Sequence, residues 1–313
     1  MSKKITILLP AYNEEASMLP LFDAMQQVAI DNPHYFWTFL LVNDGSTDLT
    51  LERMKMMHAK DARFEYLDLS RNFGKEMAMM AGFDYVTADA VIIMDSDLQH
   101  PTSSIPEMIH YWEQGYDDVF AYRITSKEQW LKRNTSKLYY KLLQKVTNIM
   151  ILRDVGDFRL LDRTCIDALR EMRETQRNTK GMYCWIGFHK KGIPYQQLER
   201  CQGNGKWGWL KLLNLAIDGF TSYTTTPLRL SLFCGTIVSL WAFFYMMYIF
   251  IDTIFYNDSV AGFPTVMITI LFLGGIQLIS LGIIGEYLGR MFNEVKRRPG
   301  YFINSYNGKR NDS

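Results

Sequence analysis

The sequence predicts an α/β protein whose N-terminal half forms a mostly parallel, doubly wound sheet, followed by apolar helices in the C-terminal third. In the first hundred residues, short apolar runs alternate with segments whose apolar residues have helical spacing. Polar clusters follow these apolar runs, and no Lys or Arg occurs from residue 230 to 289. Alternation of strands and helices is typical of parallel sheets covered on both faces.

The elements of the N-terminal half follow from the spacing of apolar residues and from turn and capping signals. Thr47 or Asp48 is expected to cap the second helix, which should end near Met57. The expected strands are 5–9, 36–42, 64–69 and 91–94, and the other expected helices are 16–29 and 74–86. Ligands of such sheets lie beyond the carboxyl ends of the strands, which is where the polar clusters fall: 10–15, 43–48, 70–75 and 95–99.

Composition excludes several classes of protein. The chain has 313 residues and a net charge of +1, so it offers no general case for binding nucleic acid. Its four cysteines form no CxxC pair and no spacing typical of a metal site, which indicates free thiols in a reducing compartment. The apolar run at the N-terminus is too short for a signal peptide, so we expect the N-terminal region to stay in the cytosol.

Two carboxylates follow the strand expected at 91–94. Asp95 and Asp97 are one residue apart, with Gln99 two residues further on. Carboxylates at this spacing point the same way at a strand end and repel one another unless a cation neutralises them. Mg²⁺ or Mn²⁺, which prefer oxygen ligands and substrate phosphates, would suit such a metal–diphosphate site. The alternative is a turn in which each Asp caps local backbone.

The usual nucleotide motifs are missing. No GxxxxGK[ST] sequence occurs, and the single GxGxxG match, at 203–208, does not follow the first strand of a βαβ unit. The first strand is instead followed by Tyr12, Asn13 and Glu14. An aromatic ring and an amide suit a base and a ribose better than a pyrophosphate.

Several motifs together resemble a known family. They occur in the order PAYNEE, VNDGSTD, LSRNFGKEMAMMAGF, MDSDLQHP and VGDFRLLDR, and GEYLGRMFNEVKRRPGY follows at residues 285–301. This order resembles family 2 glycosyltransferases of the GT-A fold, specifically the polyprenyl-phosphate branch. That branch includes bactoprenol glucosyltransferases and is similar to dolichol-phosphate mannose synthase. The sequence departs from the family pattern at Asn43, Ser96 and His100.

The resemblance implies roles for matching residues on the donor side. Asp97 would ligate the metal directly, and Asp95 would contact the nucleotide or the metal. Lys75 would lie near the diphosphate or the sugar. The simpler interpretation of Lys75 is a solvated residue at the start of a helix, and the simpler interpretation of Tyr12 is packing in the core. The full set implied for nucleotide-sugar binding is Pro10, Tyr12, Asn13, Glu14, Asp44, Lys75, Asp95 and Ser96, and that for the metal is Asp95, Asp97 and Gln99.

Other residues are assigned to the acceptor side. The family assigns the residue matching Asp157 as the base, although a phosphate acceptor is already largely ionised near neutral pH. Arg159 could orient a phosphate, or it could simply pair with Asp157 or Asp162. Arg200 and Lys206 resemble the acceptor-phosphate cations of the family, and solvated loop charges are the alternative.

The second half of the chain predicts attachment to a membrane. Residues 128–151 and 206–228 read as basic amphipathic helices that could lie in the membrane interface. Residues 230–255 and 263–287 are each long enough to span a bilayer. Basic residues flank both runs and none lies between them, so both ends should be cytoplasmic. The expected division is a catalytic domain at 1–205, an interfacial helix at 206–228, a two-helix anchor at 229–289 and a basic tail at 290–313.

The resemblance implies an inverting enzyme of the bacterial inner membrane. It would transfer one sugar, glucose or a similar hexose, from a UDP-sugar to undecaprenyl phosphate for envelope or O-antigen glycosylation. The expected partners are a second copy of the chain, a flippase and a downstream glycosyltransferase. A processive polysaccharide synthase is one alternative, but the Gln-x-x-Arg-Trp motif of such enzymes is missing. A non-catalytic membrane scaffold is another. The sequence does not identify the sugar.

Overall fold

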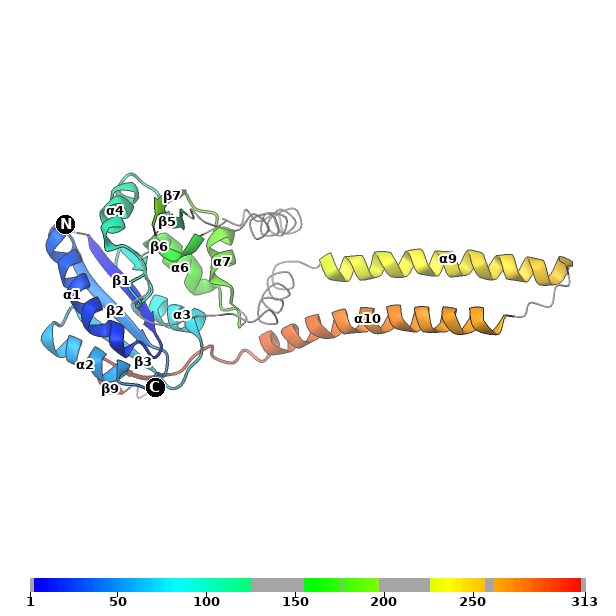
Figure 1. Cartoon of the computed structure of the whole chain (residues 1–313). Coiled ribbons are helices and arrows are strands. Elements are labelled where there is room, and N and C mark those ends of the chain that lie inside the picture. Colours follow the sequence, from blue (N-terminus) through cyan, green and yellow to red (C-terminus); the bar gives the residue numbers. More distant parts are fainter. Residues whose placement is uncertain (1–2, 125–154, 176, 197–225, 257–261, 311–313) are drawn as a thin grey trace. The chain divides into compact units, whose positions relative to one another are not determined.

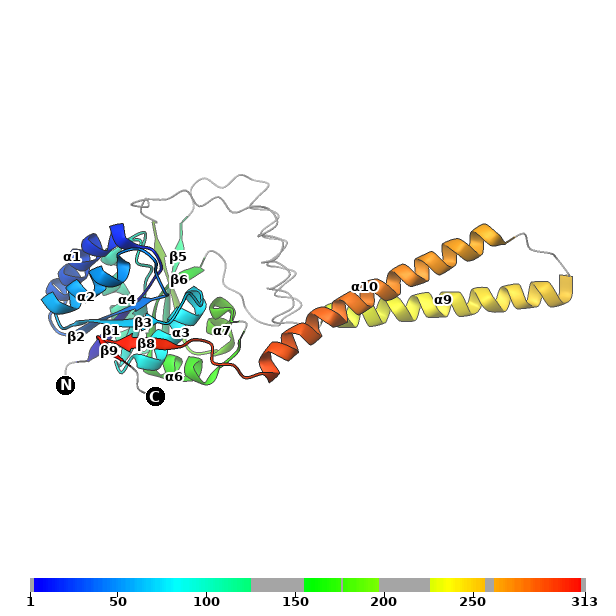
Figure 2. The same cartoon turned by 90° about the horizontal axis from the view of Figure 1, so that it is seen from below.

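The structure is a computed structural model that describes residues 3–124, 155–175, 177–196, 226–256 and 262–310. The chain divides into two compact units. The first, here the α/β unit, comprises residues 1–208 together with 299–313, and the second comprises residues 209–298. Figures 1 and 2 show the sheet of the α/β unit and the pair of long helices of the second unit in two views.

One mixed sheet forms the centre of the α/β unit. Its strand order is β7-β5-β6-β4-β1-β2-β3-β8-β9. The neighbours β4, β1, β2 and β3 are parallel, whereas β6 and β8 run antiparallel to the strands beside them. The bounds are β1 Lys4–Ala11, β2 Phe36–Asn43, β3 Phe64–Leu69, β4 Ala90–Ile93, β5 Asp118–Arg123, β6 Val155–Asp162, β7 Lys190–Tyr195, β8 Ile303–Tyr306 and β9 Lys309–Arg310.

Helices cover both faces of this sheet (Figure 1). One face carries α1 (Glu15–Asp31), α2 (Thr50–Lys60) and α4 (Ile105–Glu113), the last preceded by a 3₁₀ turn at Thr102–Ser104. The other face carries α3 (Lys75–Tyr85), α6 (Arg163–Glu171) and α7 (Thr179–Trp185). The central strands are apolar along their whole length because both of their faces are buried.

The α/β fold with a mostly parallel sheet that the sequence predicts is confirmed, with small shifts at the ends of elements. The first strand does not end at Pro10 but continues to Ala11, where it still pairs with β2. The second helix begins at Thr50, and the carboxylate of Asp48 accepts the N–H of Thr50 at 3.0 Å. Pattern reasoning therefore located these elements to within a few residues.

The strands at the C-terminus were not foreseen. The sequence predicts residues 290–313 only as a basic tail, whereas β8 pairs with β3, and β9 pairs with β8 at the edge of the sheet. The segment has no long apolar run, so pattern reasoning gave no signal. Polar contacts help to hold it, since Tyr306 donates to Glu65 at 2.6 Å and Tyr301 donates to Asp84 at 2.6 Å. Ile303 and the two tyrosine rings also pack against the apolar core.

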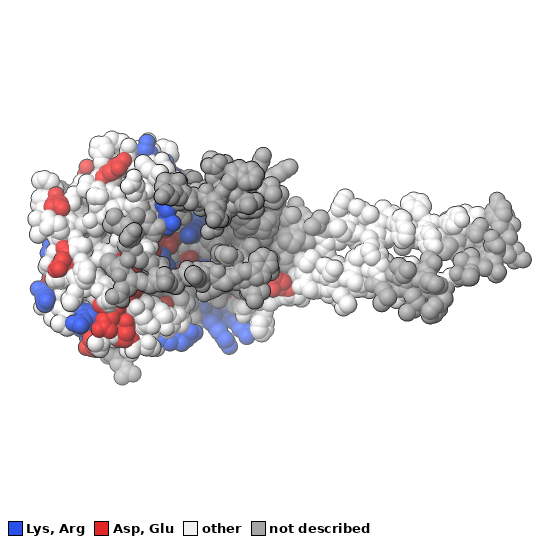
Figure 3. Space-filling model, viewed as in Figure 1, with Lys and Arg blue, Asp and Glu red and all other residues white. Residues whose placement is uncertain are grey.

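The second unit contains two long antiparallel helices, α9 (Thr226–Tyr256) and α10 (Phe263–Val295). Among the described residues, one segment, Phe272–Val295, is long and apolar enough to cross a membrane, and Ser231–Tyr245 is a shorter apolar stretch. The described side chains of this unit show few charges on the face seen in Figure 3. Both predicted helices therefore exist, but two membrane spans stay a proposal. The amphipathic helix predicted at 128–151 and most of that at 206–228 lie outside the described residues.

A buried carboxylate joins two helices of the α/β unit. Glu76, in the first turn of α3, accepts hydrogen bonds from the backbone N–H and the hydroxyl of Thr179 at the start of α7. Burial, and next the nearby carboxylate of Asp157, raises the pKa of Glu76 to about 7, although the N–H of Thr179 and the cations Lys75 and Arg177 lower it. Glu76 in the folded chain therefore stays largely protonated below about neutral pH.

We expect this carboxylate to make stability depend on pH. Glu76 has a folded pKa of about 7 against 4.5 in the reference state, so its ionisation costs stability progressively as pH rises between these values. Glu76→Gln removes this ionisation and should raise the melting temperature relative to wild type at about pH 8 more than at about pH 5. Thermal unfolding of both proteins across this range measures the difference, and a difference that does not change with pH would contradict the assignment.

Candidate active site

The loops that follow β1 and β2 are joined by hydrogen bonds at the carboxyl edge of the sheet. The N–H of Asn13 donates to the hydroxyl of Ser46 at 3.0 Å, and the side-chain oxygen of Asn13 accepts the N–H of Thr47 at 2.8 Å. Asn13 has a positive φ of 55°, which asparagine tolerates better than most residues. Two clusters that sequence analysis placed at separate strand ends therefore form one surface.

Asp44 links this surface to the loop before α3. Its two carboxylate oxygens accept the N–H groups of Phe73 at 2.7 Å and Gly74 at 2.9 Å. A Cβ atom on Gly45 would lie 2.3 Å from the carbonyl carbon of Arg71, and Gly45 has a φ of +64°. Only glycine fits this close backbone approach. Asp44 was predicted to bond the nucleoside; its side chain is 3 % exposed and holds the 73–74 backbone in place.

A lysine ammonium lies between two carboxylates of different strands. Lys75 Nζ is 2.6 Å from Asp95 Oδ1 and 2.6 Å from Asp157 Oδ2. Asp95 follows β4, and Asp157 is the third residue of the antiparallel neighbour β6, whose first residues lie beyond the end of β4. Antiparallel pairing therefore brings together two carboxylates that are 62 positions apart in the sequence (157 − 95). Lys75 is the first residue of α3 and its side chain is 41 % exposed, so it is a helix start as the alternative had it, but one that is ion-paired to two carboxylates.

The charges of this cluster stabilise one another. Burial alone would lower the pKa of Lys75, but Asp157 and Asp95 more than offset it, so the pKa is raised and the amine stays protonated. Burial alone would raise the pKa of Asp157, but the ammonium of Lys75 holds it below its usual value. Asp157 is therefore ionised at neutral pH, which makes it a weak base. Its Oδ1 is buried and has no hydrogen-bond partner among the described residues.

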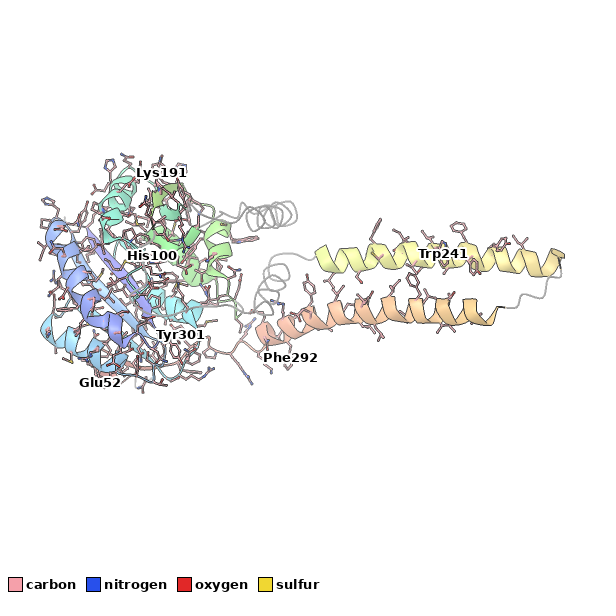
Figure 4. All side chains as sticks on the ribbon, viewed as in Figure 1. Glu52, His100, Lys191, Trp241, Phe292 and Tyr301 are labelled. Carbon is pink, nitrogen blue, oxygen red and sulfur yellow. The ribbon has the colours of Figure 1, made fainter. Side chains whose placement is uncertain are left out.

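The segment after Asp95 folds into a tight turn. Asp97 Oδ1 accepts the N–H of Gln99 at 3.1 Å, and Leu98 between them has a positive φ of 57°. The turn in which an Asp caps local backbone is thus present at Asp97. The N–H of Asp95 donates to Nδ1 of His100, whose ring, labelled in Figure 4, stacks on Phe158 at 4.8 Å between centroids. The ring of His100 therefore anchors the turn.

The donor set suits a hard divalent cation only in part. Among the described residues, no three His, Cys, Asp or Glu side chains are close enough to hold a metal by themselves. The carboxylate of Asp95 is about one-third exposed, at 34 %, and so is accessible from solvent. Mg²⁺ in phosphate-transfer sites commonly takes one or two carboxylates and completes its shell with substrate phosphates and water. Asp95 and Asp97 fit a metal held jointly with a diphosphate, and they do not fit a closed protein cage.

The structure gives Arg159 a different partner from those weighed in the sequence. Its guanidinium is 2 % exposed, donates to both oxygens of Asp118 at 3.0 and 3.2 Å, and lies 3.6 Å from the ring centroid of Tyr183. The pairing with Asp157 or Asp162, which was the alternative for Arg159, is therefore wrong. Lys190 also contacts Asp118, at 3.0 Å. Because its guanidinium is buried, Arg159 supports the residues packed behind Asp157 and is not placed to touch a substrate.

Sequence reasoning missed several residues around Asp157. They are the polar side chains packed behind Asp157, here called the polar floor: Asp118, Lys190 and Tyr183. The hydroxyl of Tyr183 has no hydrogen-bond partner among the described residues. Burial, and next the charge of Asp157, raises the pKa of Tyr183 well above its usual value. Asp118 begins β5 and Lys190 begins β7, and neither residue belongs to a recognisable sequence motif. Only the pairing of β5 with β6 and β7 could have shown that they lie close to Asp157.

The remaining predicted residues divide by position. Tyr12 is 46 % exposed, so core packing, the simpler interpretation, is wrong for it. The hydroxyl of Ser96 donates to the carbonyl of Pro10 at 3.1 Å, which ties β1 to the 95–99 turn, and the N–H of Glu14 donates to Thr50. Arg200 and Lys206 lie outside the described residues.

Comparison with known proteins places the chain in a family. Residues 6–170 match the family described as Glycosyl transferase family 2, and residues 226–291 match the GtrB C-terminal hairpin. A putative glycosyltransferase, CsbB, from Bacillus subtilis is 41 % identical, over 97 % of this chain and 92 % of its own length. The bactoprenol glucosyl transferase of Shigella phage SfX is 39 % identical, over 96 % of this chain and 99 % of its own length.

Two further proteins are similar. The prophage bactoprenol glucosyl transferase homolog of Escherichia coli is 39 % identical, over 96 % of this chain and 98 % of its own length. Among solved structures, a mannosyltransferase from Pyrobaculum calidifontis with GDP-Man and Mn²⁺ is 13 % identical at a TM-score of 0.47, over 95 % of this chain and 76 % of that one, which is too distant to support an argument. The family match and the full-length relatives are sufficient: the chain is a glycosyltransferase and belongs to glycosyl transferase family 2.

Proposed function

We propose that the chain transfers one hexose, glucose in the first instance, from a UDP-sugar to undecaprenyl phosphate. One observation carries the proposal: Lys75 joins Asp95, on the predicted donor side, to Asp157, on the predicted acceptor side, in a single charged cluster. A sugar transferase needs donor and acceptor groups this close together. The names of the relatives from phage and Escherichia coli, bactoprenol glucosyl transferases, support the choice of sugar and lipid.

The donor would bind over the joined loops at the carboxyl edge of the sheet. Tyr12 is exposed there and offers an aromatic face to a base, and Asn13 and Ser46 fix the loop that carries it. Asp95 and Asp97 would hold Mg²⁺ or Mn²⁺ together with the diphosphate. When bound, the metal would neutralise the charge that develops on the departing nucleotide.

Asp157 would orient the acceptor and would do little proton transfer. Its lowered pKa makes it a poor base, and a phosphate acceptor near neutral pH already carries most of the negative charge needed for attack. Attack from the face opposite the leaving nucleotide would invert the configuration of the sugar. Lys75, next to Asp157, would limit the repulsion between this carboxylate and the incoming phosphate.

The acceptor phosphate would also need cations near the membrane. We assign this role to Arg200 and Lys206, which precede the hairpin in sequence beside two tryptophans. Interfacial aromatic and basic residues commonly lie at the level of lipid headgroups. The hairpin itself, α9 and α10, would anchor the enzyme in the bacterial inner membrane with both ends cytoplasmic.

The reaction can be tested directly. Membranes that contain the chain are incubated with radiolabelled UDP-glucose, UDP-N-acetylglucosamine or GDP-mannose, each with and without undecaprenyl phosphate, and the lipid extract is analysed. The proposal expects label in a single-sugar lipid, dependent on the added acceptor, with UDP-glucose as donor. Label in a polymer would favour a processive synthase, and no label with any donor would favour a non-catalytic scaffold.

Loss of one predicted metal ligand should abolish transfer without unfolding the protein. Asp97→Ala would leave the diphosphate charge uncompensated, and we expect a rate at least about a hundredfold lower, in line with the loss of a major electrostatic contribution. Asp167→Ala is a matched control, because this carboxylate is 51 % exposed on α6 and pairs only with arginines of its own helix among the described residues. Equal rates for the two variants, at equal melting temperatures, would rule out the role of Asp97.

The two-span topology predicts which residues are accessible from outside the cell. A cysteine at Asn257, between the two helices, should react with a membrane-impermeant reagent in intact cells, because it lies in the link with no basic residue. A cysteine at Lys309, in the exposed edge strand β9, should react only after lysis. The reverse pattern would refute two spans with cytoplasmic ends.

A further inference from the structure

The chain that leaves the C-terminal hairpin returns to the α/β unit beside the predicted donor site. Strand β8 pairs with β3 through Leu67, Asp68 and Leu69, and the register shifts between the last two. The N–H of Ser70 donates to the carbonyl of Phe302 at 2.9 Å. The segment therefore lies against the carboxyl end of β3, where the 70–75 loop begins.

A line of side-chain hydrogen bonds runs from β8 into the sheet. Asn304 Nδ2 donates to Asp68 Oδ2 at 2.8 Å, and Asn43 Nδ2 donates to Asp68 Oδ1 at 2.7 Å. Asn43 and Asp68 are register partners on β2 and β3 and are 1 % and 5 % exposed. A carboxylate at this depth is costly unless both of its oxygens are bonded, and Asn304 supplies the bond to one of them.

The line continues into the predicted nucleotide loops. The side-chain oxygen of Asn43 accepts the N–H of Ser46 at 3.2 Å, and the hydroxyl of Ser46 accepts the N–H of Asn13. The same amide of Asn43 therefore faces Asp68 with its nitrogen and the Asn43–Ser46 turn with its oxygen. Because a flip of this amide would break both bonds, the position of Asp68 determines which way Asn43 points.

A second contact reaches the same region through aromatic rings. The ring of Phe302 lies 6.4 Å from that of Phe73, measured between centroids, and the guanidinium of Arg71 lies 4.0 Å from the Phe73 ring centroid. The N–H of Phe73 is one of the two donors to Asp44. The C-terminal segment thus supports both the Asn43–Ser46 turn and the loop that leads to Lys75.

We propose that β8 is part of the donor site, in which Asn304 is a positioning residue that acts through Asp68 and Asn43 on the loop that binds the nucleotide. The inference rests on the proposed function, since it assumes that a uridine nucleotide binds over these loops. It has a reciprocal consequence: if the strand supports the nucleotide, the nucleotide must hold the strand in place. Because β8 follows α10 in the chain, the end of the hairpin is then covalently connected to a strand of the donor site.

The same segment provides its own control. Tyr306 donates to Glu65 at 2.6 Å, and its ring packs on Tyr85, away from the nucleotide loops. Tyr306→Phe removes one hydrogen bond between β8 and β3, as Asn304→Ala does. It leaves the line through Asp68 and Asn43 intact. A purely structural role of β8 in holding the edge of the sheet predicts that the two variants behave alike.

The experiment compares UDP binding with Mn²⁺ present, by calorimetry on the full-length protein. We expect Asn304→Ala to weaken UDP binding by about three- to tenfold, from the loss of one bond to a buried carboxylate. Asn304→Asp, of the same shape but with a second carboxylate against Asp68, should weaken it further, and Tyr306→Phe should bind like wild type. Hydrogen exchange tests whether the nucleotide in turn stabilises the strand. Saturating UDP should slow exchange of the Asn307 amide, which donates to the carbonyl of Tyr66.

The outcomes separate this inference from the proposed function. If wild type binds UDP, but Asn304→Ala, Asn304→Asp and Tyr306→Phe bind it equally well, β8 only extends the sheet and the inference is wrong. Loss of UDP binding in all three variants, with equal drops in melting temperature, also overturns it. If wild type itself does not bind UDP, the proposed donor is wrong whatever β8 does.

Discussion

The charged cluster of Lys75, Asp95 and Asp157 is the interaction on which the rest of the site depends. Two carboxylates brought this close would repel one another, although the exposure of Asp95 to solvent screens part of that repulsion. The ammonium of Lys75, 2.6 Å from each, removes that repulsion. The cluster requires three elements at once: α3 must begin at this edge, β4 must end there, and β6 must start there.

Around this cluster the α/β unit builds rigid support from backbone contacts. Asp44 holds the 73–74 amides, and the close approach of Gly45 to Arg71 leaves no room for a side chain. Behind the cluster, Arg159 and Lys190 pair with Asp118, so that the negative charge of this buried carboxylate is neutralised. Such interlocked loops suit a site that must position two substrates, because an error of about 1 Å can cost a large factor in rate.

Local patterns predicted a large part of this arrangement. The strands and helices of the first hundred residues follow from apolar spacing, and Asp95 and Asp97 follow from their place after a buried strand. The partners of distant residues could not be predicted in this way. That β6 runs antiparallel, so that Asp157 meets Lys75, depends on a pairing that leaves no periodic mark in the sequence. The partner of Arg159 could not be predicted for the same reason, since Asp118 lies on another strand.

The strand β8 is a second element that the sequence did not allow us to predict. It is short and polar, and it follows a long apolar helix, so composition suggested a tail. Its place in the sheet comes from hydrogen bonds to Asp68 and Tyr66, which only the folded chain brings within reach. Membership of glycosyl transferase family 2 agrees with the motifs read in the first half of the chain. The family match to a C-terminal hairpin agrees with the two helices that follow.

The central claim is that Asp95, which pairs with Lys75 at 2.6 Å, also serves a divalent cation that is held together with a diphosphate. Mn²⁺ binding at saturating UDP, followed by electron paramagnetic resonance in wild type, Lys75→Gln and the exposed-lysine control Lys55→Gln, tests it most directly. Removing the competing ammonium should tighten Mn²⁺ binding by about tenfold, roughly 1.4 kcal/mol, in Lys75→Gln alone. Unchanged or weaker Mn²⁺ binding in Lys75→Gln would contradict the account.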